Sequence, residues 1–115
     1  MLLRVEPNSS QSLHDQLAGQ VRKAIADGEL RPGEKLPAAR GLAESLGVNV
    51  HTLLRAFQTL RDEGLLDIRR GRGTVVTGAA PKFAKFAGLA RKLVDEARRA
   101  GLADGEIVQL VEAQL

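Results

Sequence analysis

The sequence predicts a mainly helical α+β chain, in which three helices precede a small β-hairpin and two further helices complete 115 residues. Three observations favour this fold class. Apolar residues recur at three- and four-residue spacing through the first half of the chain. A glycine-rich turn then separates two short runs suited to strands. Finally, Pro81 stands where a new helix would begin.

The first helix is expected over residues 11–27, with Ser9 and Ser10 as a polar cap and Gly28 as the residue that ends it. Its apolar residues fall on one face: Leu13, Leu17, Val21, Ala24 and Ile25. A loop and the short extended piece Lys35-Leu36-Pro37 follow.

Two helices, over residues 39–46 and 50–63, are predicted on either side of a short turn, with Asn49 as the N-cap of the second. This spacing is typical of a helix-turn-helix. The second helix of the pair has an apolar face made of Leu53, Ala56, Phe57 and Leu60. His51, Arg55 and Gln58 lie on its other face.

A β-hairpin is predicted next, with strands at 65–68 and 74–77 around the turn 69–73. A helix-turn-helix followed by a basic hairpin is the pattern of a winged helix-turn-helix. We therefore assign residues 1–78 to a winged helix-turn-helix domain and residues 79–115 to a helical tail.

The tail is expected to hold two helices, the first ended by Gly101 and the second capped by Asp104. So short a tail has too little protein around it to bury its own apolar stripe, so we expect a second copy of the chain to cover it. The predicted dimerisation residues are Phe83, Phe86, Ala90, Leu93, Ala97, Ile107, Leu110 and Val111.

Composition argues against catalysis and metal binding. The chain has no cysteine and only two histidines, and Asp62-Glu63 and Asp95-Glu96 are neighbours whose side chains diverge on a helix. We therefore expect no enzyme activity, cofactor or metal site. Because Arg4, Glu6 and Pro7 interrupt the apolar start and no long apolar run follows, we expect a cytoplasmic protein without a membrane partner.

The arginines of the hairpin turn indicate double-stranded DNA as the partner, because they serve no core and suit phosphate or minor-groove contacts. A merely solvated hairpin is the alternative. Arg40 suits a phosphate contact or an ion pair with Glu44, while Val50 and Leu54 either touch a thymine methyl group or are buried. The predicted DNA-binding residues are Arg40, Asn49, His51, Thr52, Arg55, Arg69, Arg70, Gly71, Arg72, Gly73 and Thr74.

Residues 12–76 resemble the GntR family of winged-helix regulators in the order and spacing of several short motifs. These motifs are Gly28-Glu29-Leu30-x-Pro32-Gly33, Leu36-Pro37, Arg40-x-Leu42-Ala43, Leu46-Gly47-Val48, Glu63-Gly64-Leu65 and Arg70-Gly71-Arg72-Gly73-Thr74. The resemblance implies DNA contacts from Arg40, the start of the third helix and the hairpin turn.

The chain departs from the family pattern at two places: only the arginine of the first carries over, and the second resembles the small YtrA-like branch of the family. Ala38-Ala39-Arg40 replaces the usual Ser-Glu-Arg, and Val50 and Leu54 stand where many members have arginine. The short tail likewise resembles the two-helix dimerisation tail of that branch. The resulting hypothesis is a homodimeric repressor on an inverted-repeat operator. A winged-helix module that binds only proteins is the alternative, and a small-molecule effector is left open.

Overall fold

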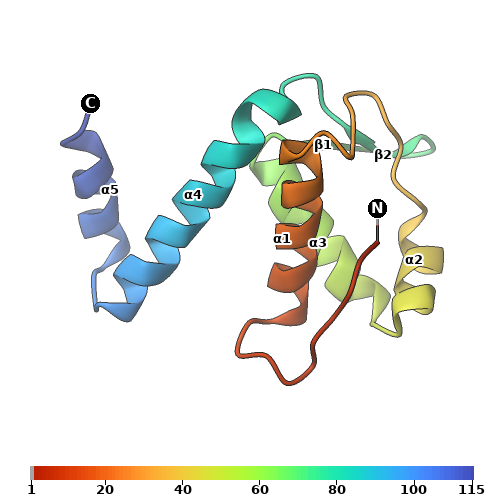
Figure 1. Ribbon diagram of the computed structural model, residues 1–115, viewed down its shortest axis with the longest axis horizontal. Helices are drawn as coiled ribbons and strands as arrows, with labels where there is room; N and C mark the ends of the chain where they lie inside the picture. Colours follow the sequence, from red (N-terminus) through yellow and green to blue (C-terminus); the bar gives the residue numbers. More distant parts are fainter. Residues whose placement is uncertain (1) are drawn as a thin grey trace.

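The computed structural model describes residues 2–115 and contains five helices and one two-stranded antiparallel sheet (Figure 1). The elements are α1 (Leu13–Ala26), α2 (Ala39–Leu46), α3 (Val50–Asp62), β1 (Leu66–Arg69), β2 (Gly73–Val76), α4 (Ala80–Arg99) and α5 (Asp104–Glu112). The predicted mainly helical α+β class is confirmed.

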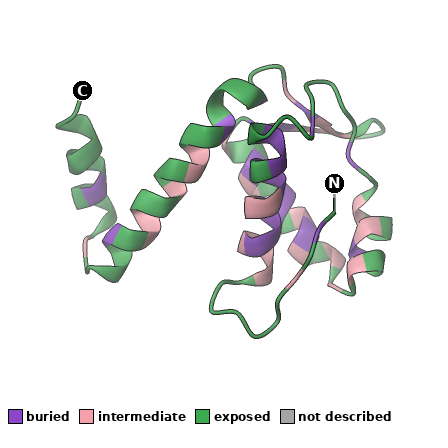
Figure 2. Cartoon of the chain, viewed as in Figure 1, coloured by how far each residue is buried: buried purple, intermediate pink, exposed green. Residues whose placement is uncertain are grey.

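The core lies between α1, α3 and the hairpin, as the buried segments in Figure 2 show. Leu17, Val21 and Ile25 of α1 have no exposed surface, which confirms the predicted apolar face of that helix. Phe57, the largest core side chain, comes from α3 and is 1% exposed. Leu65, Leu66 and Val76 anchor the hairpin to the same core.

Two predicted helix caps are wrong. Ser12, not Ser9 or Ser10, caps α1, and its hydroxyl accepts a hydrogen bond from the Asp15 N–H at 3.3 Å. Ser9 instead accepts from the Gln11 N–H within the preceding turn. Asp104 is likewise the first residue of α5 rather than its cap.

Ala103 occupies the N-cap position of α5, and its N–H donates to Glu106 Oε1 at 2.9 Å. Asp104 is engaged elsewhere, because its two carboxylate oxygens accept hydrogen bonds from Arg98 at 3.1 and 3.3 Å. This hydrogen-bonded pair raises the pKa of Arg98 and ties the end of α4 to the start of α5.

Two glutamine side chains of α1 hold the N-terminal segment by hydrogen bonds to its backbone N–H and carbonyl groups. The Gln16 amide accepts from the Glu6 N–H at 2.8 Å and donates to the Glu6 and Gln11 carbonyl oxygens. Gln20 accepts in the same way from the Arg4 N–H at 2.8 Å. The buried Leu3 thus becomes part of the core.

The first turns of α4 pack along α1, where Ala80 and Ala84 join the core cluster. Small side chains allow the two helices to approach closely. Near this contact the Arg22 guanidinium forms two hydrogen bonds with the Glu63 carboxylate, at 2.8 and 2.6 Å. Arg22 and Glu63 therefore link α1 to the end of α3 directly beside α4, where the Gly88 backbone lies close to Arg22.

Candidate nucleic-acid interface

The hairpin turn presents basic side chains because the two strands pair in a fixed register. Ile68 pairs with Thr74 and Arg69 with Gly73, so Arg70 and Arg72 lie exposed at the turn. Gly71 and Gly73 adopt φ angles of 82° and 83°, a conformation that side chains with a Cβ rarely take. The two glycines therefore let so short a turn carry exposed arginines.

The three arginines of the hairpin differ in their surroundings. Arg69 Nε donates to Asp67 Oδ2 at 2.7 Å, and both side chains lie on β1. Arg70 and Arg72 take part in none of the ion pairs formed among residues 2–115. The free positive charge of the turn is therefore that of Arg70 and Arg72, while the charge of Arg69 is largely balanced.

Helix α3 turns one face to the core and the other to solvent. The predicted apolar residues are buried, and His51, Arg55 and Gln58 are exposed as expected. Thr52 is half-buried. The Asn49 side chain accepts from the His51 N–H at 2.8 Å, which confirms its predicted role as N-cap.

Val50 and Leu54 are half-buried, which lies between the two alternatives that the sequence left open. Val50 packs against the core cluster. Arg40 is exposed in the first turn of α2, and the ion pairs among residues 2–115 do not include the alternative pair with Glu44. Its guanidinium is available to an external anion.

The predicted DNA-binding residues belong to α2, to the start of α3 and to the hairpin. Helix α2, the start of α3 and the hairpin lie at the same end in Figure 1, whereas α4 and α5 extend from the opposite end. In winged-helix proteins that bind DNA through a helix-turn-helix, such a side presents one helix to the major groove and flanking cations to the phosphates. This arrangement joins side chains from three separate elements.

One basic residue beside the hairpin was not among the predicted set. Lys35 forms an isolated antiparallel bridge with Val75 of β2. The only sequence signal was the extended piece Lys35-Leu36-Pro37, which does not reveal its partner because the pairing joins residues far apart in the chain.

The predicted dimerisation residues divide into two groups. Ala97 and Ile107 are 8% and 6% exposed and are buried where α4 and α5 meet, so they face their own chain. The others are exposed: Phe83, Phe86, Ala90, Leu93, Leu110 and Val111. Leu89 and Val108, which were not among the predicted residues, are exposed as well.

Residues 13–76 match the family model described as bacterial regulatory proteins of the gntR family. The chain belongs to this family. The match covers α1 to the end of β2, the segment that carries the helix-turn-helix and the hairpin, and confirms the resemblance inferred from the motifs.

Two curated relatives are similar to this GntR-family chain. The HTH-type transcriptional regulator Rv1152 of Mycobacterium tuberculosis is 35% identical over 107 residues, which make up 93% of this chain and 88% of the relative. The HTH-type transcriptional repressor YtrA of Bacillus subtilis is 33% identical over 76 residues, 66% of this chain and 58% of the relative. The similarity to YtrA agrees with the branch that the short tail suggested.

Two solved structures are similar to this chain, one over most of its length and the other in complex with DNA. YtrA from Sulfolobus acidocaldarius has a TM-score of 0.64 at 34% identity and covers 82% of this chain and 99% of its own. The DNA-binding domain of AraR, solved in complex with operator ORX1, has a TM-score of 0.59 at 29% identity over 67% of this chain and 95% of its own.

The GntR-family chain is thus a transcriptional regulator with a DNA-binding winged helix, and its relatives are named as regulators rather than as enzymes. Residues 2–115 hold no cluster of three or more histidine, aspartate or glutamate side chains placed to share a metal ion. No helix in the described part is long and apolar enough to cross a membrane.

Proposed function

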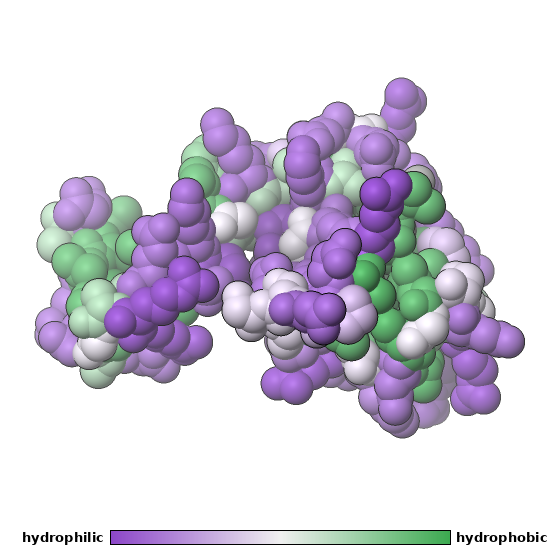
Figure 3. All heavy atoms as spheres, turned by 60° about the horizontal axis from the view of Figure 1, so that its bottom comes forward, coloured by the Kyte–Doolittle hydropathy of each residue, from purple (hydrophilic) through white to green (hydrophobic). Residues whose placement is uncertain are grey.

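We propose that this regulator binds an inverted-repeat operator as a homodimer and represses transcription there. The observation that carries the proposal is an exposed apolar surface on α4 and α5, at the opposite end from the candidate DNA interface. Figure 3 shows hydrophobic surface at this end of the molecule, in addition to a second hydrophobic area on the body of the chain.

The exposed apolar surface of the tail is unusual for a soluble monomer. Phe83, Phe86 and Leu89 of α4 are 47%, 62% and 53% exposed. On α5, Val108, Leu110 and Val111 are each about half exposed. Contiguous apolar surfaces of this kind mark interaction sites, because leaving large hydrophobic side chains in water is unfavourable.

Charge favours a second copy of the chain as the occupant. Among the side chains outside the ion pairs of residues 2–115, α4 carries four basic ones and one acidic one, and α5 two acidic ones: Lys82, Lys85, Lys92, Arg99 and Glu96, and Glu106 and Glu112. Helix α5 of one protomer is therefore complementary to α4 of its partner. In a two-fold dimer this contact occurs twice, which gives the self-complementary interface that such symmetry requires.

A dimer built on the tails presents two helix-turn-helix units to one duplex. Two-fold symmetry in the protein then favours a two-fold symmetric operator. Repression is the outcome that the name of the Bacillus subtilis relative supports, since YtrA is called a repressor.

Sedimentation velocity on the full chain tests the dimer directly. We expect the parent to be a dimer and Phe86→Glu to be a monomer, because the substitution places a charge in the apolar surface. Leu2→Glu is the matched control, since Leu2 is 77% exposed on the N-terminal segment, and it should remain dimeric. A monomeric parent would overturn the proposal.

A promoter-reporter assay tests repression. Once the operator is known, placing it over a promoter should lower transcription in the presence of the parent protein, and the Phe86→Glu variant should restore most of it. Increased transcription with the parent would contradict repression while leaving DNA binding intact.

A further inference from the structure

Lys35 lies on a short extended segment whose backbone pairs with the outer edge of β2. The Leu36 N–H donates to the Thr74 carbonyl oxygen at 2.8 Å, and the Val76 N–H donates to that of Glu34 at 2.9 Å. Between these bonds Lys35 is directly opposite Val75. The backbone of Lys35 is therefore held against β2, although the residue precedes the helix-turn-helix in sequence.

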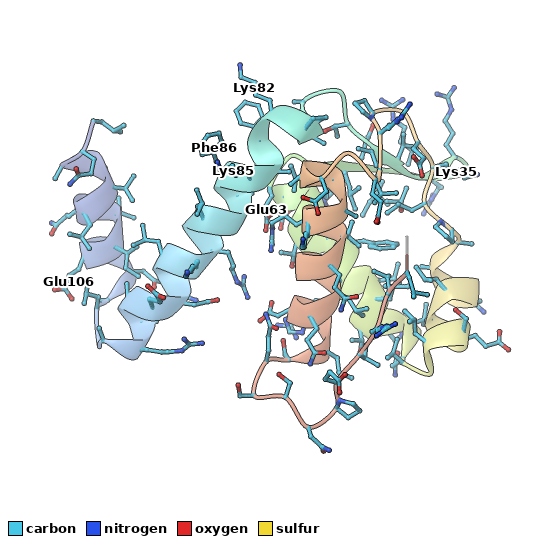
Figure 4. All side chains as sticks on the ribbon, viewed as in Figure 1. Lys35, Glu63, Lys82, Lys85, Phe86 and Glu106 are labelled. Atoms are coloured by element: carbon cyan, nitrogen blue, oxygen red, sulfur yellow. The ribbon has the colours of Figure 1, made fainter. Side chains whose placement is uncertain are left out.

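The Lys35 side chain runs across Gly73. A Cβ placed on Gly73 would lie 2.9 Å from Lys35 Cε and 3.7 Å from its Nζ, so the lysine occupies the space that a side chain at Gly73 would need. Gly73 begins β2 directly after the turn, which brings the ammonium group to the base of that turn. Figure 4 shows Lys35 beside the hairpin, on the side of the molecule that carries α2.

Two acidic residues belong to the segments beside Lys35, namely Glu34 in the same segment and Asp67 opposite Val75, and both accept hydrogen bonds from other groups. Glu34 Oε1 accepts from the Arg31 N–H at 3.2 Å, and the Asp67 carboxylate accepts from Arg69. Lys35 itself takes part in none of the ion pairs among residues 2–115. Lys35 therefore has no ion-pair partner among these residues, in contrast to Arg69.

We propose that Lys35 supplies a phosphate contact of the wing, the hairpin formed by β1, β2 and their turn, together with Arg70 and Arg72. Arg69 then serves to neutralise Asp67 rather than to contact DNA. The inference rests on the proposed binding of duplex DNA. A lysine suits this task because its ammonium group acts as a point charge toward phosphate oxygens.

The test measures the affinity of the full chain for a fluorescein-labelled mixed-sequence duplex by anisotropy, from about 50 to about 200 mM NaCl. Each phosphate contact adds about 0.9 to the slope of log K against log salt. We expect Lys35→Gln to reduce the magnitude of this slope by about 1. Lys35→Arg should restore the parent slope, and thermal melting should show that both variants are folded.

Two controls separate a contact from a change in net charge. The double variant Asp67→Asn with Arg69→Gln removes both members of an ion pair and should keep the parent slope. Arg99→Gln removes one positive charge from the far end of α4 and should keep it as well.

Three outcomes would overturn the inference. A parent-like slope for Lys35→Gln excludes the lysine contact, and a reduced slope for the double variant returns the contact to Arg69. A parent that binds no duplex even at low salt would overturn the proposed function itself, and the inference with it.

Discussion

Arg22 and Glu63 form the most enclosed ion pair of the described chain, with side chains 10% and 20% exposed. Their two hydrogen bonds satisfy charges that α1, α3 and α4 largely shield from water. Removing one partner from such a pair leaves the other charge buried without compensation, which costs more than the pair itself contributes. The pair thus links α1 to the end of α3, beside α4.

We expect Glu63→Gln to lower the free energy of unfolding by about 3 kcal/mol, because Arg22 then loses its counter-charge. Urea denaturation followed by circular dichroism measures this change. Asp27→Asn breaks the exposed Lys23–Asp27 pair and is the matched control, with an expected loss below about 0.5 kcal/mol. Equal losses in the two variants would show that the Arg22–Glu63 pair is not effectively buried.

Arg40 and Arg72 are exposed cations on two elements that flank α3. Arg72→Ala or Arg40→Ala should weaken DNA binding by about 1–3 kcal/mol, because each removes a charged donor to DNA. Fluorescence anisotropy at fixed salt gives the affinities, and unchanged melting temperatures show that the fold is kept. Binding equal to the parent in both variants would remove these residues from the interface.

At the scale of elements, α2 lacks a side-chain cap because its N-cap residue is Ala38. The backbone of Ala38, with φ −57° and ψ 134°, already has a non-helical conformation suited to a capping residue. Ala38→Ser should therefore stabilise the protein by about 1 kcal/mol, since a hydroxyl would accept an unpaired N–H of the first turn. Thermal unfolding measures the gain, and Ala38→Val, which supplies no acceptor, should give none.

We expect α3 to contact bases through His51, Thr52 and Arg55, because its opposite face is buried in the core. Arg55→Ala should relax base preference more than it lowers affinity for mixed-sequence DNA. Selection from a randomised duplex library measures preference, and Arg72→Ala provides the contrast because a wing contact should weaken all sequences alike. A parent-like preference for Arg55→Ala would place sequence reading elsewhere.

At the scale of the whole molecule, the proposed dimer would couple two DNA interfaces through the tail. The same selection with the parent protein should recover inverted repeats with half-sites about 10 base pairs apart, one helical turn, so that both α3 helices enter the major groove on one face. Phe86→Glu should recover single half-sites at reduced affinity, because the linked second site is lost. Inverted repeats recovered equally by both proteins would separate operator symmetry from the tail surface.

The sequence by itself determined the order and type of the elements. Helices α1 to α3 and the hairpin follow from apolar spacing, capping residues and glycine turns, which are local properties. The bounds of α2 were predicted to the residue, while the start of α1 was misplaced because three nearby serines compete as caps. The exposed arginines of the turn were likewise visible, since no core position could hold them.

Only the tertiary structure decided which of these residues act together. The spacing of residues in the sequence could not show that Lys35 lies against β2 or that Arg22 pairs with Glu63. Nor could it show that Ala97 and Ile107 are buried within one chain. It also could not show that Arg69 is balanced by Asp67, because an ion pair depends on side-chain directions as well as on spacing. Periodicity states which face of a helix is apolar, and the packing of distant segments determines what that face meets.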